Sequence, residues 1–181
     1  MKTKLLLVQL FIFSTYILPA QFPVHVKEIE SIANQTVNIK GNLGQGAKME
    51  NLSWAWKSSN ACFPATQKLK FTGNHVLYAT KLPPRAIMYI TVIPDDKNAN
   101  FSLYAYQIGT TNYSTVPDLN SCVSCEADYK WDYAKVNKTQ DHSRMVELNS
   151  TTNAYNVVIG VVGSNGLTTG AYTLKITLKS T

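Results

Sequence analysis

Short stretches of alternating apolar and polar residues dominate the sequence, and helical periodicity is nearly absent. Alternation with a period of two places successive side chains on opposite faces of a β-strand. Residues 172–179 show it most clearly, with four apolar side chains against four polar ones. Residues 156–162 (NVVIGVV) are apolar on both faces, which indicates a central strand. Further strands are predicted at residues 68–71, 76–80, 86–93, 101–106 and 145–148.

Turn-forming residues separate these stretches. Residues 72–75 (TGNH) predict a hairpin between the stretches on either side, and residues 163–166 (GSNG) predict another between the last two strands. In residues 101–106, Phe101, Leu103 and Ala105 are expected to face the core, whereas Ser102, Tyr104 and Tyr106 face outward. Short strands joined by Gly, Pro and Asn turns favour an all-β fold, an antiparallel β-sandwich.

Two segments carry a family resemblance. Residues 82–106 (LPPRAIMYITVIPDDKNANFSLYAY) place Leu-Pro-Pro before a β-rich run and a short strand, and residues 153–178 (NAYNVVIGVVGSNGLTTGAYTLKITL) end in a glycine-spaced closing strand. Together they resemble the bacterial pre-peptidase C-terminal domain. The resemblance implies a small jelly-roll-like β-sandwich, of a kind usually found behind the catalytic domains of secreted peptidases. It spans about residues 65–178, so we expect a sandwich over 65–181 and, over 21–64, an extension partly packed on it.

One departure from the family concerns metal binding. Many relatives carry aspartates just before the second of these strands, where this chain has Asn98 and Asn100. Calcium binding through those aspartates is therefore in doubt here. Asp95, Asp96, Glu126 and Asp128 could bind calcium weakly through oxygen ligands, but no spaced Asp-x-Asp-x-Asp-Gly loop exists. We expect no cofactor and no dedicated metal site.

The first 20 residues predict export. Residues 5–18 form an apolar run after Lys2 and Lys4, and the small residue Ala20 follows Pro19. This is the pattern of a secretory signal peptide cut after Ala20. The alternative is an uncleaved membrane anchor, but the 14-residue run falls short of the roughly 20 residues that span a bilayer. We expect one domain after the signal peptide, located outside the cell, in the periplasm or at the cell surface, with no membrane span in the mature chain.

Charge excludes one class of partner. The full chain has a formal charge of +6, and without Lys2 and Lys4 it keeps 15 basic and 11 acidic residues, a charge of +4. The excess is dispersed and forms no basic run. Nucleic-acid binding needs Lys and Arg clustered on one face, so no nucleic-acid partner is expected.

The stretch NSCVSCEADYKWDY, residues 120–133, contains two of the three cysteines. A zinc site needs about four ligands, and a redox pair needs a helix N-terminus that lowers the thiol pKa; neither fits an acidic loop in an all-β chain. An oxidising compartment favours a disulfide. We favour Cys122–Cys125, and the alternative pairs Cys62 with one of them and leaves the other free.

Aromatic side chains supply the candidate binding face. Tyr129, Trp131 and Tyr133 alternate in the same stretch, as do Trp54 and Trp56 in SWAW. Exposed on strands, they could stack on a polysaccharide or contact a protein; alternatively, they pack the sandwich or cover its edge.

No catalytic residues are predicted. VVGSNG lacks the glycine that a nucleophile elbow places two residues before the serine, and Asp141-His142-Ser143 are chain neighbours, unlike the members of a triad. We therefore predict a secreted non-catalytic accessory or binding module that engages a polysaccharide or protein surface. The alternative is a secreted hydrolase or inhibitor whose site the sequence does not reveal.

Overall fold

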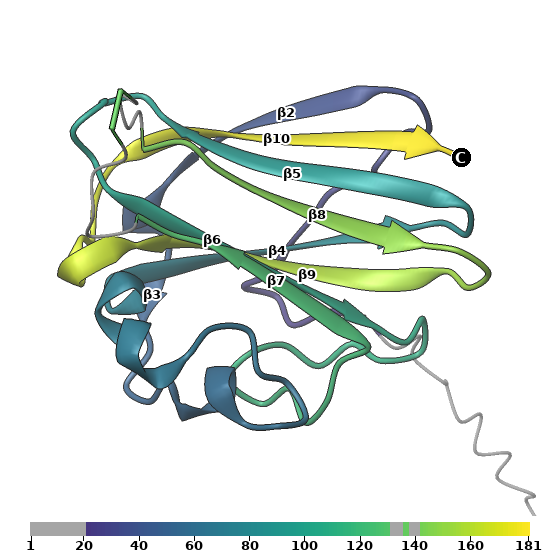
Figure 1. The fold of residues 1–181 in the computed structure, drawn as a ribbon, viewed down its shortest axis with the longest axis horizontal. Helices are drawn as coiled ribbons and strands as arrows, with labels where there is room; N and C mark the ends of the chain where they lie inside the picture. Colours follow the sequence, from purple (N-terminus) through teal and green to yellow (C-terminus); the bar gives the residue numbers. More distant parts are fainter. Residues whose placement is uncertain (1–20, 131–135, 138–141) are drawn as a thin grey trace, which may run out of the picture.

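The computed structural model describes residues 21–130, 136–137 and 142–181. Two β-sheets pack face to face, and loops and short 3-10 helices form a third layer over the outer face of one of them (Figure 1). This confirms the predicted all-β sandwich.

The first sheet has four strands, all antiparallel. Their order across the sheet is β2 (Thr36–Asn42), β10 (Ala171–Ser180), β5 (Ala86–Pro94) and β8 (Arg144–Ser150). Buried and more exposed side chains alternate along β8 and through most of β10, as the sequence pattern predicts. One face of this sheet therefore packs on the other sheet, and the opposite face meets solvent.

The second sheet has six strands. Its order is β1 (Lys27–Glu28), β4 (Asn74–Leu82), β9 (Tyr155–Gly163), β6 (Phe101–Ile108) and β7 (Ser124–Asp128), with β3 (Ala47–Lys48) also on β4. β1 runs parallel to β4, and every other pairing is antiparallel. The strands predicted at residues 76–80, 101–106 and 156–162 are β4, β6 and β9.

Two hydrophobic cores lie on the two faces of the six-stranded sheet. The first lies between the sheets and includes Phe101, Leu103 and Tyr172. The second lies between the six-stranded sheet and the third layer, and includes Trp54, Tyr104 and Tyr106. Every residue of β6 is consequently buried. As predicted, Phe101, Leu103 and Ala105 face the core between the sheets, and Ser102, Tyr104 and Tyr106 face the opposite side. That side does not meet solvent, because the third layer covers it.

The helical elements are all short 3-10 helices in the described part of the chain. They are η1 (Leu43–Gln45), η2 (Ser53–Trp56), η3 (Ala65–Phe71) and η4 (Ser164–Gly166). Residues 68–71, predicted as a strand, belong to η3, where Lys70 and its neighbour Phe71 are both buried while Leu69 is exposed. No strand therefore precedes residues 72–75, and the predicted hairpin there is wrong.

The connection between the last two strands also differs from the prediction. β9 lies in the six-stranded sheet and β10 in the four-stranded sheet, so they do not form a hairpin. Their link contains η4, in which Asn165 and Gly166 adopt positive φ angles of 52° and 79°. These residues tolerate positive φ, as the sequence indicated, but here the turn carries the chain from one sheet to the other.

Strand β2 brings part of the N-terminal stretch into the sandwich. It lies within residues 21–64, where an extension was expected, and pairs with β10 along its length from Thr36 to Asn42. Val37 and Ile39 alternate with more exposed polar residues in β2, a pattern that also identifies the strand in the sequence. The four-stranded sheet therefore includes a strand from before residue 65.

Candidate functional site

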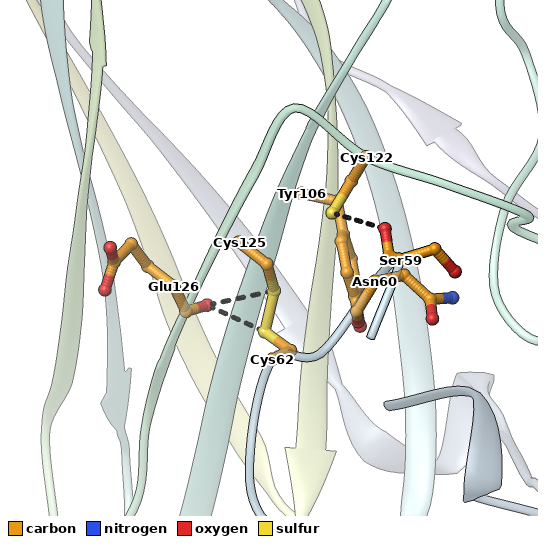
Figure 2. The surroundings of a disulfide bond; sticks show 7 residues. All are labelled: Ser59, Asn60, Cys62, Tyr106, Cys122, Cys125 and Glu126. Atoms are coloured by element: carbon orange, nitrogen blue, oxygen red, sulfur yellow. Dashed lines mark hydrogen bonds between the residues drawn. A yellow bond between two sulfur atoms is a disulfide. The ribbon is translucent and has the colours of Figure 1, made fainter. Parts of the chain in front are cut away.

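The disulfide joins Cys62 to Cys125, and Cys122 is a free thiol (Figure 2). The predicted Cys122–Cys125 pair is wrong, because Cys125 of β7 bonds to a distant cysteine. Cys122 lies before β7, and its backbone N–H donates to the carbonyl oxygen of Ser59, which places this part of the chain beside the segment that carries Cys62. The Cα atoms of Cys62 and Cys125 are 5.2 Å apart.

The free thiol of Cys122 is partly buried and is not activated. Its Sγ atom lies 3.7 Å from the carbonyl oxygen of Ser59. Burial raises the pKa of this thiol. A reactive cysteine needs the opposite shift, so the site has none of the features of thiol catalysis.

Two of the described residues of the predicted aromatic binding face are buried. Trp54 and Tyr129 are buried in the second core, and the Trp54 ring packs against Phe63 and two tyrosines of β6. Trp54 and Trp56 lie in η2, so they do not share one face of a strand, and Trp56 is only partly exposed. Trp131 and Tyr133 lie outside the described residues. For the described members of this set, packing is the role that the structure shows.

No described layer covers the outer face of the four-stranded sheet. We call this surface the open face (Figure 1). On β5, Ile87, Tyr89, Thr91 and Ile93 point away from the inter-sheet core. The exposed residues of β8 on this face are Met145, Glu147 and Asn149, which lie opposite Thr91, Tyr89 and Ile87 in the strand register.

Lysines lie along the other two strands of the open face. Lys175 and Lys179 of β10 and Lys40 of β2 are exposed. β8, on the far side of β5 from β10, contributes one carboxylate, Glu147. The Lys179 Nζ atom lies 5.3 Å from the centre of the Tyr89 ring, a cation–π arrangement. Lys40 also pairs with Asp95 at 3.5 Å. The open face therefore combines an apolar strip on β5 and β8 with a basic border.

The sequence predicts β5, β8 and β10 but not β2, and it does not single out the open face. Residues 86–93 are apolar at nearly every position, so alternation does not show which row faces the core. Met88 and Ile90 are fully buried, whereas Ile93 is 40% and Met145 54% exposed. β5 pairs with β10, whose alternation is clear, so this pairing could have shown which side chains of β5 face the core.

His75 occupies a structural position. Its Nε2 atom donates to the carbonyl oxygen of Phe71 at 2.9 Å, so the neutral ring accepts the Tyr104 hydroxyl at Nδ1, 3.1 Å away. Burial is the main cause that lowers its pKa to about 4. His75 also lines a pocket of about 310 Å³ beside β3. Neither ring partner is a serine, cysteine or carboxylate, so this histidine is not arranged as a catalytic base.

The acidic residues considered for calcium have structural contacts. Asp95 pairs with Lys40, and Asp128 accepts a hydrogen bond from the backbone N–H of Met145 at 2.9 Å. No group of three or more His, Cys, Asp or Glu side chains gathers in metal-binding geometry among the described residues. In the same part of the chain, no helix is long and apolar enough to cross a membrane.

Comparison with known proteins gives similarity of structure only. No protein-family model and no curated protein matches the sequence. The pre-peptidase C-terminal domain of a collagenase from Bacillus anthracis is similar at 14% identity and a TM-score of 0.39, over 87% of this chain and 99% of that one. It is a member of the family that the sequence resembles. PliG from Aeromonas hydrophila, a periplasmic inhibitor of g-type lysozyme, is similar at 10% identity and a TM-score of 0.37, over 84% and 96%. At these identities the likeness concerns architecture and not activity.

Proposed function

We propose that the protein is a non-catalytic binding module that acts outside the cytoplasm, and that its open face contacts a protein partner. The observation that carries the proposal is the unequal covering of the two sheets. A core rich in aromatic residues lies over the outer face of the six-stranded sheet, whereas the outer face of the four-stranded sheet keeps Ile93 and Met145 exposed. Exposed apolar side chains gathered on one face are a feature of interaction surfaces.

Two features favour a location outside the cytoplasm. A disulfide between residues 63 positions apart is typical of an oxidising compartment. The apolar run at residues 5–18 after two lysines has the composition of a signal peptide. Secretion as a mature chain that begins at Gln21 is therefore part of this proposal, and N-terminal sequencing of secreted protein tests it.

The composition of the open face favours a protein over a polysaccharide. Stacking on sugar rings needs exposed aromatic platforms; on the open face, Tyr89 is the only aromatic residue among the described residues, and Lys179 lies over its ring. Aliphatic and methionine side chains beside a tyrosine resemble the centre of a protein interface. The lysine border favours a partner with an acidic rim.

Substitution on the open face tests this assignment. Ile93→Glu and Met145→Glu place a charge within the apolar strip and should each abolish capture of extracellular proteins on immobilised protein. Leu69→Glu is the matched control, because Leu69 is 60% exposed on η3, in the layer on the far side of the molecule. Capture that persists in both open-face variants contradicts the proposal. Retention on insoluble polysaccharides, lost in the same variants, would assign the open face to a different ligand.

A further inference from the structure

One edge of the four-stranded sheet has no neighbouring strand among the described residues. β2 is the last strand on that side, beside the open face (Figure 1). It pairs with β10 in one unbroken register from Thr36 to Asn42, so it contains no bulge, and it contains no proline. Bulges, prolines and charged side chains are the usual features that protect a sheet edge from another strand. The single charged residue of β2, Lys40, lies 3.5 Å from the carboxylate of Asp95, so this edge is weakly protected.

The hydrogen bonds between β2 and β10 show which backbone groups of β2 point to the free edge. The N–H of Leu178 donates to the carbonyl oxygen of Gln35, and the N–H of Leu43 donates to the carbonyl oxygen of Gly170. Both bonds continue the register of the two strands, in which the odd-numbered residues of β2 direct their backbone groups to β10. The N–H and C=O groups of residues 36, 38 and 40 therefore point away from β10.

The opposite edge of the same sheet is closed by side chains. At β8, the backbone N–H of Met145 donates to the Asp128 carboxylate at 2.9 Å, and the carbonyl oxygen of Asn149 accepts a hydrogen bond from Gln107 at 2.8 Å. Both side chains come from the six-stranded sheet. No such bond reaches the outward backbone groups of β2 from any described residue. β2 is therefore the edge of this sheet at which a further strand can add.

The side chains of β2 suit a second copy of the same strand. Val37 and Ile39 lie on the inner face, opposite core residues of β10, yet both are only partly buried because no strand lies beside them on the other side in the described chain. Thr36, Asn38 and Lys40 are exposed and lie on the open-face side. An added strand would therefore need apolar side chains on its inner face and uncharged polar or acidic side chains on its outer face.

We propose that two copies of the protein pair through β2, antiparallel and centred on Asn38. In this register each Val37 lies beside the partner's Ile39, which covers the apolar row, and each Thr36 lies beside the partner's Lys40. The outward backbone groups of the two strands then form about six hydrogen bonds. A register centred on Ile39 places Val37 beside a glycine, and one centred on Lys40 places like charges directly opposite each other.

The pairing joins the two four-stranded sheets into one continuous sheet. The two-fold axis that relates two identical antiparallel strands is perpendicular to the sheet, so both open faces point in the same direction. One dimer therefore presents two open faces to a partner, which increases avidity. This consequence rests on the proposed function, whereas the pairing itself does not.

Sedimentation equilibrium over a wide range of protein concentration tests the pairing, and we expect a reversible equilibrium between monomer and dimer. Asn38→Pro removes an N–H at the centre of the pair that β10 does not use, at a position where an edge strand accepts proline. This variant should weaken the dimer about tenfold or more. Asn38→Thr is the matched control, because it keeps the N–H and a residue that favours strands, and it should dimerise like the wild type. Circular dichroism shows whether both variants fold.

Disulfide trapping tests the register without the proline variant. It uses the Cys122→Ser background, in which the other two cysteines are bonded to each other. Asn38→Cys should form a dimer linked through residue 38 on oxidation, because Cα atoms directly opposite each other are about 5.5 Å apart. Lys40→Cys is the matched control, because its two copies are separated by about 14 Å along the strands, too far for a disulfide.

Defined results overturn the proposal. A monomer at every concentration does so, as does a folded Asn38→Pro variant that dimerises like the wild type. Linking through residue 40 as readily as through residue 38 contradicts the register. Ile93→Glu should leave the dimer intact, and a dimer lost in that variant belongs to the open face instead. A dimer that captures no partner counts against the proposed function alone, and a monomer that captures one counts against the pairing alone.

Discussion

Two hydrogen bonds between buried side chains, His75 to Tyr104 and Tyr78 to Tyr172, join polar groups inside the two cores. His75 of β4 and Tyr104 of β6 both lie on the outer face of the six-stranded sheet. Tyr78 and Tyr172 lie between the sheets. Buried polar groups cost stability when they lose a partner. We therefore predict how a change at each pair alters the stability of the protein.

Acid should destabilise the protein through His75. Its pKa is about 4 in the folded protein against an ordinary value of 6.5. Between these values the unfolded chain binds the proton and the folded chain does not, so stability decreases as pH falls from about 6.5 to about 4. The loss should be about 2–3 kcal/mol at pH 4.5. Urea unfolding at pH 7 and 4.5 measures it.

The matching variants isolate this histidine. His75→Gln should reduce the difference in stability between the two pH values, whereas His25→Gln should not, because His25 is exposed. An equal acid response in the wild type and His75→Gln would show that other groups cause the loss.

The tyrosine pair should behave non-additively. The hydroxyl oxygens of Tyr78 and Tyr172 are 2.8 Å apart, and both side chains are fully buried. Either single change to phenylalanine leaves one buried hydroxyl without its partner and should cost about 1–3 kcal/mol. The double variant removes both polar groups and should be more stable than the sum of the single effects predicts. Additive free energies of unfolding in a double-mutant cycle would contradict the coupling.

At the scale of elements, β9 depends on a glycine beneath a tyrosine ring. Gly160 lies opposite Tyr104 of β6, and a Cβ atom at residue 160 would lie 2.0 Å from Cζ of that ring. The ring is fully buried in the second core, where it packs against Trp54 and Tyr106. Gly160→Ala should therefore cost about 1–3 kcal/mol, as overpacked cores do. Thermal or urea unfolding gives the value.

Gly109 provides the control for that prediction. It follows β6, is exposed, and has no atom within 4 Å of an added Cβ. Gly109→Ala should change stability by no more than about 0.5 kcal/mol. If both alanine variants were equally stable, the ring of Tyr104 would have to shift without cost.

Most strands could be predicted from the sequence because alternation is a local signal. β4, β5, β6, β8, β9 and β10 all lie where apolar and polar residues alternate or where an apolar run is bounded by turns. Strand pairing is not local. The Gly163–Gly166 turn fits a hairpin by composition, yet β9 and β10 pair with strands of different sheets. Residues 68–71 alternate by coincidence, since two adjacent side chains in η3 are buried together.

At the scale of the whole molecule, the third layer explains why the candidate site could not be predicted. Tyrosines have the amphipathic character of surface residues, and those of β6 are buried only because the third layer, which includes Trp54, packs on them. That layer comes from residues distant in the chain, so no local pattern reports it. The open face was missed for the converse reason, because an apolar strand does not show which of its sides lacks a neighbour.

The disulfide should hold the third layer onto the six-stranded sheet. It links residue 62, between η2 and η3, to β7, over a sequence separation of 63. Loop-closure entropy grows with loop length, so a link of this span should contribute about 4 kcal/mol, against about 1.5 kcal/mol for a pair only three residues apart. Cys62→Ser with Cys125→Ser should therefore lower stability strongly, and hydrogen exchange should accelerate first in residues 49–73 while β10 stays protected.

Cys122→Ser is the control that separates this pairing from the other two. Cys122 forms no disulfide and is only partly buried, so the change should cost less than about 1 kcal/mol. Peptide mapping without reduction should recover a fragment that joins Cys62 to Cys125, with one free thiol at Cys122. A mapped link from Cys122 to either other cysteine would contradict the pairing. The double variant and Cys122→Ser should not lose equal amounts of stability. If they did, the free thiol would matter as much as the disulfide, and the disulfide would not be what anchors the third layer.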